Sequence, residues 1–170
     1  RKYAAKLGLS FHVGTHCLDT GAYAHAVKIA TDVINACGVN VEAIDIGGGF
    51  PATLDPANPP PPLKDYIDAA LGSLRAANME GIEFLCEPGR GMVAAGGQLV
   101  VRVESRKGDL LYLNDGTYGG MFEGGPSCDL PYPVRMIRAK GAKSTAAMAP
   151  FRFAGPTCDS ADVLYEKSNY

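Results

Sequence analysis

The first half of the chain alternates short apolar runs with longer stretches of helical spacing. Apolar runs over 9–14, 41–46 and 83–86 end at glycine or proline, which predicts three buried strands. Apolar residues recur every three or four positions over 19–38 and 63–74, which predicts a helix in each interval. The order strand, helix, strand, helix, strand is typical of a parallel sheet with helices packed outside it.

Each predicted helix has an apolar face that should cover the sheet. The first helix should begin with Asp19 or Thr20 as its N-cap and end at Gly38. Its face combines two neighbouring stripes, Ala22, Ala26, Ile29 and Val33 beside Tyr23, Val27, Ala30 and Ile34. The second face consists of Leu63, Ile67, Ala70 and Leu74. Before the first strand, 3–7 should be the end of a helix that Gly8 stops, and the proline-rich segment 51–62 should be an extended loop.

The pattern changes near residue 97. Leu99, Val101 and Val103 alternate with Val100, Arg102 and Glu104 in a period of two. The segment 106–109 supplies a turn before an apolar run over 110–113. This part is therefore predicted to be an antiparallel β domain over 98–170, after an α/β domain over 1–97. From Met121 onwards prolines punctuate short irregular segments.

Composition excludes several classes of function. The 170 residues are 46% hydrophobic and 20% charged, with a net charge of −2 and no basic block, so the chain has no electrostatic surface for nucleic acid or an anionic membrane. No apolar run is long enough to span a bilayer. The five cysteines are an odd number without a CxxC pair, which argues against a disulfide framework and a metal site and favours a reducing, cytoplasmic location. The chain opens on Arg1 without an initiator Met, which favours an interior piece of a longer protein.

Polar and glycine residues follow each predicted strand. His12 and Thr15 follow the first strand, Gly47 to Gly49 the second, and Glu87 to Arg90 the third. Parallel strands share a carboxyl edge, so these groups should lie on one rim, where α/β proteins bind ligands. An arginine beside glycine N–H groups suits a phosphate, and a nearby glutamate suits a basic ring nitrogen, a combination that pyridoxal phosphate offers.

Plainer readings of the same residues remain open at this point. Glu87 and Arg90 can be a surface pair at a turn, the glycines can serve a turn that needs positive φ, and His12 can be a satisfied core residue. In the β part, 115–119 can be a turn. The loop 155–160 sets a thiol beside a carboxylate, although a lone cysteine is usually a small buried apolar residue.

Five motifs in order resemble one known family. They are FHVG at 11–14, DIGGGFP at 45–51, CEPGR at 86–90, NDGTYG at 114–119 and GPTCDS at 155–160. Together they resemble the fold-type III, pyridoxal-phosphate-dependent ornithine/lysine decarboxylases, and the loop at 155–160 is less similar to that of diaminopimelate decarboxylases. The resemblance implies the last strands of a TIM barrel over 1–97 and part of an antiparallel β domain over 98–170.

The resemblance also implies roles for individual residues. His12 would stack on the cofactor ring, Glu87 would face its pyridine nitrogen, and Cys158 would protonate the substrate carbon after decarboxylation. Asp159 would bind the distal ammonium of the substrate, and Tyr118 would be a second substrate-binding residue. The remaining cofactor-binding positions, most of them around the phosphate, are Thr15, Gly47, Gly48, Gly49, Pro88, Gly89 and Arg90. Cys158 and Asp159 would act in the neighbouring subunit's site of a homodimer.

Some positions depart from the family pattern. Thr15 stands where the family usually has serine, which keeps the hydroxyl. The region of Glu123, Cys128 and Asp129 matches too loosely to assign a substrate-binding acid. The Schiff-base lysine of the family lies upstream of Arg1, so this chain alone would lack it.

The resemblance implies decarboxylation of a basic amino acid, with ornithine to putrescine, in polyamine biosynthesis, as the leading reaction. Lysine, diaminopimelate or arginine decarboxylation on the same fold is an alternative. A third reading, from another class, is a non-catalytic homologue that binds a regulatory protein in place of the enzyme.

Overall fold

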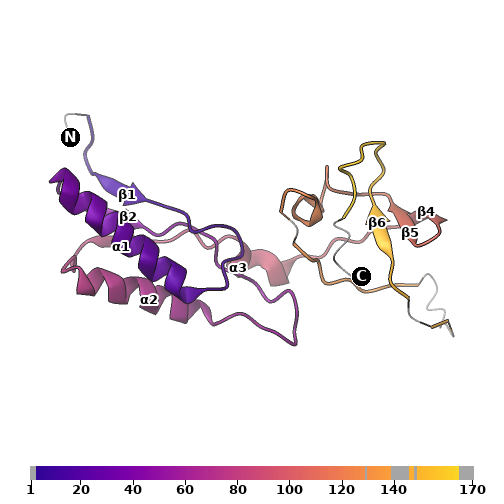
Figure 1. The fold of residues 1–170 in the computed structure, drawn as a ribbon, viewed down its shortest axis with the longest axis horizontal. Helices are drawn as coiled ribbons and strands as arrows, with labels where there is room; N and C mark the ends of the chain where they lie inside the picture. The colour runs from indigo at the N-terminus through magenta and orange to yellow at the C-terminus, as the bar shows by residue number, and fades with distance from the viewer. Residues whose placement is uncertain (1–2, 129, 139–145, 148, 165–170) are drawn as a thin grey trace. The chain divides into compact units, whose positions relative to one another are not determined.

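The computed structural model describes residues 3–128, 130–138, 146–147 and 149–164. The chain divides into two compact units, 1–97 and 98–170, and each is described separately below (Figure 1).

The first unit contains a parallel sheet of three strands in the order β1-β2-β3. Residues Leu9, Ile44 and Phe84 lie side by side in register across the sheet. The predicted parallel arrangement is therefore confirmed, although each strand is shorter than predicted. The elements of this unit are β1 (Gly8–Ser10), α1 (Thr20–Cys37), β2 (Ala43–Asp45), α2 (Leu63–Ala76), β3 (Glu83–Leu85), α3 (Arg90–Val93) and η1 (Ala94–Gly96).

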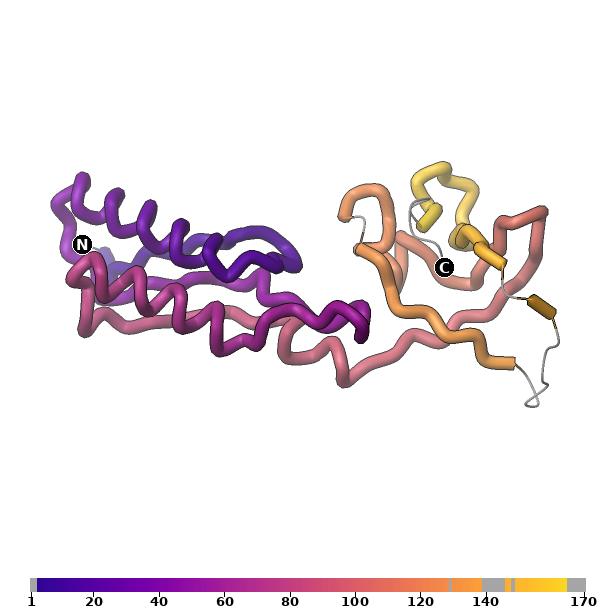
Figure 2. The backbone as a smooth tube through the Cα atoms, turned by 60° about the horizontal axis from the view of Figure 1, so that its bottom comes forward, coloured from indigo at the N-terminus to yellow at the C-terminus, as the bar shows by residue number. Residues whose placement is uncertain are grey.

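Helices α1 and α2 cover the face of the sheet that carries Leu9, Ile44 and Phe84. Both Figure 1 and Figure 2 show the two helices side by side along the strands. Because successive residues of a strand point to opposite faces, only one residue of each strand enters this core. Its buried members are Tyr23, Val27, Ala30, Ile44, Ile46, Phe50, Tyr66, Ala70 and Leu74.

The bounds of α1 follow from its capping residues, as predicted. The Asp19 carboxylate accepts a hydrogen bond of 2.8 Å from the N–H of Gly21, which satisfies one of the free donors of the first turn. Gly38 adopts φ 62°, the left-handed conformation that ends a helix most easily when the residue has no Cβ. The proline-rich segment before α2 contains no helix or strand, also as predicted.

Only one of the two apolar stripes predicted for α1 is buried. Tyr23, Val27, Ala30 and Ile34 are buried, whereas Ile29 and Val33 are 51% and 45% exposed. In α2, Leu63 is likewise 41% exposed, and Tyr66 takes the buried place beside Ala70 and Leu74. A helix that packs on a sheet and beside one other helix buries only a stripe of its surface and not half of its circumference, so apolar residues outside that stripe stay exposed.

The segment before β1 is not the end of a helix, which corrects the prediction for 3–7. The N–H of Leu7 donates to a carboxylate oxygen of Glu42, and the N–H of Glu42 donates to the carbonyl of Leu7, each at 2.8 Å. These bonds draw residue 7 alongside the chain that leads into β2. Gly8 consequently begins the strand, where its close approach to Ala43 leaves little room for a side chain.

The second unit contains a mixed sheet in the order β4-β5-β6. Its elements are β4 (Val103–Lys107), β5 (Leu110–Leu113), η2 (Phe122–Gly124) and β6 (Arg152–Ala154). The predicted antiparallel hairpin is confirmed for β4 and β5, with Gly108 at φ 63° in the turn between them.

Strand β6 pairs parallel to β5, so the expectation of a wholly antiparallel sheet is wrong. The Arg152 guanidinium donates to both carboxylate oxygens of Asp109 at 3.0 Å, and the Arg152 N–H donates to the Asp109 carbonyl at 2.9 Å. Asp109 and Arg152 thus lie side by side where β5 and β6 begin. The alternation over 99–101 also lies outside β4, which begins at Val103.

The α/β part followed by a β part is thus observed. The closed TIM barrel that the resemblance implies remains a prediction, since the described residues form a sheet of three parallel strands. Across those residues, no helix combines the length and the apolar character that crossing a membrane requires.

The one-sided core of the first unit predicts unequal effects for two isoleucines of the complete protein. Replacing Ile44 with Ala should lower the free energy of unfolding by about 2–5 kcal/mol, because the side chain is fully buried at the centre of the sheet. Replacing Ile29, which is half exposed on α1, should cost less than about 1 kcal/mol. Urea denaturation of both variants measures this difference, and equal losses would contradict it.

Candidate functional site

The carboxyl ends of β1, β2 and β3 meet at one rim. The N–H of Phe11, after β1, donates to the Asp45 carbonyl at 3.1 Å. The N–H of Glu87, after β3, donates to the Gly47 carbonyl at 2.8 Å. The structure therefore brings together the segments that carry His12, the three glycines and Glu87.

The glycine turn, Gly47 to Gly49, is connected to three other segments through its carbonyl groups. The Gly47 carbonyl accepts from the N–H of Glu87 at 2.8 Å, and the Gly49 carbonyl accepts from the N–H of Cys17 at 2.9 Å. The Gly48 carbonyl accepts from the hydroxyl of Tyr23 at 2.9 Å. At the start of the turn, the N–H of Gly47 donates to the Asp45 carboxylate at 2.8 Å. The turn is thus oriented by bonds from α1, from the loop after β1 and from the segment after β3.

Glycine is required at this turn for two reasons. Gly47 and Gly49 have φ values of 68° and 91°, which residues with a Cβ rarely adopt. A Cβ on Gly48 would lie 2.9 Å from the Glu87 carbonyl oxygen and 3.2 Å from Nε2 of His12. Only a bare backbone lets the three strand ends approach this closely.

The imidazole of His12 lies beside Gly48 with a defined hydrogen-bonding state. Its Nδ1 accepts a bond of 2.9 Å from the N–H of Gly14. A nitrogen that accepts in this way carries no proton, so in the neutral ring the proton is on Nε2. His12 is exposed and not a core residue, which leaves a ring face available for stacking.

The remaining predicted cofactor residues lie in the loops after β1 and β3. Thr15 is exposed in a turn between Gly14, at φ 109°, and His16, at φ 55°. Gly89 precedes α3, which begins at Arg90, and a Cβ on Gly89 would meet open space. Pro88 is half-buried just before it. A Cβ on Gly91 would lie 3.3 Å from the Phe50 side chain, so the start of α3 adjoins the residue that follows the glycine turn.

In the second unit the structure brings Tyr118 and Asp159 together. The Tyr118 hydroxyl donates to one carboxylate oxygen of Asp159, and the N–H of Ala161 donates to the other, both at 2.8 Å. The bond from Ala161 and that from Tyr118 hold the pKa of Asp159 below its usual value. Asp159 is therefore an exposed, ionised group at neutral pH, suited to a cation.

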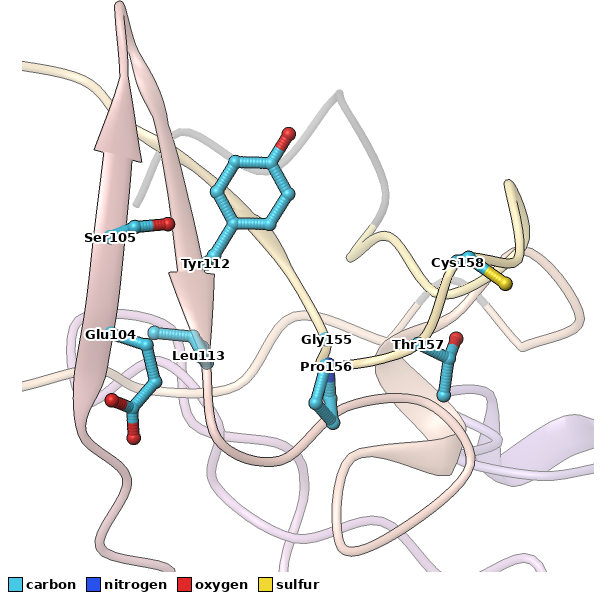
Figure 3. Close-up of a pocket in the computed structure, with 8 residues that line it drawn as sticks. All are labelled: Glu104, Ser105, Tyr112, Leu113, Gly155, Pro156, Thr157 and Cys158. Atoms are coloured by element: carbon cyan, nitrogen blue, oxygen red, sulfur yellow. The ribbon is translucent and has the colours of Figure 1, made fainter.

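Cys158 is exposed beside Asp159 and lines a cavity of about 410 Å³ within the second unit. Figure 3 shows its thiol on the loop that follows β6, with Thr157 as its neighbour. The cavity extends from this loop to β4 and β5, and its lining residues are Glu104, Ser105, Tyr112, Leu113, Gly155, Pro156, Thr157 and Cys158. Glu104 is paired with Arg102, so the cavity does not present an uncompensated charge at that position.

Asp162 is the residue that sequence reasoning missed in this unit. It is 1% exposed and accepts from the N–H of Thr117 at 2.8 Å and from the hydroxyl of Thr157 at 2.7 Å. A Cβ on Gly116 or Gly155 would collide with its carboxylate. Asp162 thereby joins the turn that carries Tyr118 to the loop that carries Cys158. The motifs at 114–119 and 155–160 both contain glycine and threonine, which was the available sign of a shared contact. Neither motif indicates that Asp162 is the acid that contacts both.

Hydrogen bonding determines the charge state of Asp162. Burial alone would raise its pKa, but the bonds from Thr157 and Thr117 outweigh burial and leave the pKa below the usual aspartate value. The group is therefore a buried carboxylate that stays ionised at neutral pH.

In the first unit, sequence reasoning missed Tyr23 and Asp45 as supports of the glycine turn. Tyr23 was expected only as a core residue of α1, and no local pattern indicates where its hydroxyl donates. Burial raises the pKa of this hydroxyl well above its usual range, so it remains a donor. Asp129 lies outside the described residues. Among those that are described, no three histidine, cysteine or acidic side chains are arranged to hold a metal ion.

Comparison with known proteins places the chain in a family. Residues 4–94 match the family described as pyridoxal-dependent decarboxylase, pyridoxal binding domain. The chain is 29% identical to antizyme inhibitor 2 of Xenopus laevis over 95% of this chain and 39% of the relative. It is 29% identical to ornithine decarboxylase of Mus musculus over 96% of this chain and 39% of the relative.

A solved structure agrees with these relatives. The lysine/ornithine decarboxylase from Vibrio vulnificus, complexed with cadaverine, aligns with a TM-score of 0.70 and 30% identity, over 94% of this chain and 43% of that one. The chain therefore belongs to the fold-type III pyridoxal-phosphate-dependent decarboxylase family that includes the ornithine/lysine decarboxylases. It spans about two fifths of the length of the relatives it matches.

The residues on the rim fit the family's cofactor, pyridoxal phosphate. The N–H of Gly49 donates to no acceptor within the described parts of the chain, which leaves it available to an anionic oxygen. His12 offers a planar ring, Glu87 an acid for a ring nitrogen and Arg90 a guanidinium for a phosphate.

The ionised state of Asp162 predicts how stability depends on pH. Because its pKa is lower in the folded than in the unfolded chain, its contribution is full above about pH 4 and is lost as the pH falls through the folded value. Asp162→Asn should lower the free energy of unfolding by about 2–3 kcal/mol at neutral pH, since an amide group would face the donors of Thr117 and Thr157. The variant should also lose less stability on acidification than the parent.

Chemical denaturation from neutral to acidic pH measures both effects. Asp109→Asn is the control, because Asp109 is an exposed carboxylate paired with Arg152 in the same unit, and it should change stability little. Equal losses for the two variants would show that Asp162 does not connect the two loops.

Proposed function

We propose that this chain is part of a pyridoxal-phosphate-dependent decarboxylase of basic amino acids, with L-ornithine to putrescine as its reaction in polyamine biosynthesis. The observation that carries the proposal is the meeting of His12, the glycine turn and the Glu87 segment at one rim of a parallel sheet. Membership of the decarboxylase family supports the same chemistry.

The rim would hold the cofactor by its two ends. Thr15, the N–H groups of Gly49 and Gly89, and Arg90 would bind the phosphate, while His12 would stack on the ring. Glu87 would face the ring nitrogen and keep its proton in place. When bound, pyridoxal phosphate supplies an acceptor for the electron pair that remains on the substrate when carbon dioxide leaves.

The loop of the second unit would bind and protonate the substrate. Asp159 would bind the distal ammonium, and its position is supported by the bond from Tyr118. Cys158, exposed next to it, would donate a proton to the α-carbon. In this proposal both act in the neighbouring subunit's site of a homodimer.

The proposal extends to the architecture and location of the complete protein. Unit 1–97 would be the last part of a TIM barrel, and unit 98–170 part of the following β domain. The solved lysine/ornithine decarboxylase that aligns with both units supports this assignment. The five cysteines are free thiols, a state that a cytoplasmic location maintains.

A second candidate is a non-catalytic homologue that binds a regulatory protein. The similarity to antizyme inhibitor 2 of Xenopus laevis favours it. Against it stand His12, Glu87, Arg90 and Cys158, a set that has no evident use in a protein without the cofactor. Lysine, diaminopimelate and arginine remain alternative substrates within the enzyme hypothesis.

The complete protein tests these alternatives directly. Purified from cells supplied with pyridoxine, it should carry the cofactor's visible absorbance and release carbon dioxide from ornithine faster than from lysine, arginine or diaminopimelate. A protein that binds no cofactor and is inert on all four amino acids would overturn the proposal and favour the non-catalytic reading.

Cys158→Ala should lower kcat by about 100-fold and leave cofactor affinity unchanged, because the thiol acts after the carboxylate has left. Cys37→Ala is the matched control, since this exposed thiol lies at the end of α1 and should not affect kcat. Turnover with ornithine and cofactor titration measure the two quantities. A variant with normal turnover, or one whose turnover falls only as far as its cofactor affinity falls, would refute the role given to Cys158.

Asp159→Asn should raise KM for ornithine about tenfold or more, because the amide cannot pair with the distal ammonium. Norvaline has the same chain length without the ammonium and provides the comparison. The variant should lose most of the preference of kcat/KM for ornithine over norvaline. An unchanged preference would exclude Asp159 from substrate recognition.

A further inference from the structure

Tyr23 places a hydroxyl group inside the core of the first unit. The side chain is completely buried, and its hydroxyl donates to the Gly48 carbonyl over 2.9 Å. A phenylalanine would fill the same apolar space, so packing alone does not account for the hydroxyl. The role of the hydroxyl follows from the peptide group to which it donates.

The peptide between Gly48 and Gly49 is planar and trans, so its C=O and N–H point in opposite directions. Tyr23 binds the C=O from the core side. The N–H of Gly49 must therefore point away from the core, and it donates to no acceptor in the described residues. The hydroxyl of one side chain thus determines where a free backbone donor is aimed.

The ring of Tyr23 is held in a fixed position by two aromatic neighbours. It stacks on Phe50 with centroids 4.9 Å apart and planes at 14°, and it meets Tyr66 edge-on at 5.4 Å. Phe50 directly follows Gly49, so the face of the Tyr23 ring packs on the residue next to the turn while its hydroxyl binds the turn itself. The hydroxyl has little freedom to follow a peptide that rotates.

Without this bond the turn would have a competing conformation. Gly48 and Gly49 have no Cβ, and flipping the peptide between two glycines meets little steric resistance. The neighbouring carbonyls of Gly47 and Gly49 are bound by other segments, but neither bond acts on the Gly48 carbonyl itself. Tyr23 is the group that distinguishes the two orientations of this peptide.

We propose that Tyr23 is a positioning residue for phosphate binding: its hydroxyl locks the Gly48–Gly49 peptide so that the N–H of Gly49 points at the phosphate group of the ligand. This inference rests on the proposed function, since it assigns the phosphate of pyridoxal phosphate to the glycine turn. It adds a residue on α1 that does not touch the ligand and acts through the backbone.

The test is Tyr23→Phe in the complete protein, with Tyr66→Phe as the matched control. Each variant removes one hydroxyl from the same buried aromatic cluster, but the Tyr66 hydroxyl donates to the Leu18 carbonyl and not to the glycine turn. Each protein is titrated with pyridoxal phosphate and with pyridoxal, which has the same ring without the phosphate. Fluorescence titration measures both dissociation constants without requiring turnover, and thermal unfolding reports stability.

Tyr23→Phe should weaken binding of pyridoxal phosphate about tenfold and change binding of pyridoxal by less than about twofold, as expected for loss of one oriented hydrogen bond to an anion. Tyr66→Phe should leave the preference for the phosphorylated ligand unchanged. Equal weakening of both ligands by Tyr23→Phe, or no weakening of either, would overturn the inference, as would a parent protein without preference for the phosphate. A parent that prefers pyridoxal phosphate, shows the Tyr23 effect and decarboxylates nothing would support the inference while refuting the proposed activity.

Discussion

The first unit depends on one constraint, the close approach of three parallel strand ends that only glycine permits. Gly47 and Gly49 adopt positive φ values, and Gly48 lies against both His12 and the Glu87 backbone. A side chain at any of these positions would separate the strand ends. The N–H of Gly47 donates to the Asp45 carboxylate, whereas the N–H of Gly49 is turned away from the core because the Tyr23 hydroxyl binds the carbonyl of the same peptide group. The proposed anion site of the rim therefore depends on the backbone geometry of the turn and on the side chain that orients it.

In the second unit, a buried charged group holds two loops together. Asp162 is buried, yet its pKa is lowered because donors from Thr117 and Thr157 surround its carboxylate. A buried carboxylate is costly unless it is hydrogen-bonded, so its presence fixes the two loops in one relative arrangement. Tyr118 and Asp159 meet as a result, because each lies within a few residues of one of these threonines. The exposed groups proposed to bind substrate are therefore positioned by a group that is hidden.

The two units have different relations to the family. The match to the pyridoxal binding domain covers 4–94, almost the whole first unit, and the solved lysine/ornithine decarboxylase aligns with 94% of the chain. The first unit therefore supplies the residues proposed to bind the cofactor, and the second supplies those proposed to recognise the substrate. Under the proposed function, substrate preference would depend on 155–160 and on Asp162, which supports this loop and was not anticipated from the sequence.

The sequence by itself determined the local elements and the family. Asp19 and Gly38 bound α1 because capping is a property of a few neighbouring residues, and the parallel order of β1, β2 and β3 follows from the alternation of strands and helices. The tertiary structure alone decided which stripe of α1 is buried, the direction of β6, and the partners of Tyr23 and Asp162. Those contacts join groups 25 and 45 residues apart, and their geometry depends on how separate segments pack and not on any local pattern.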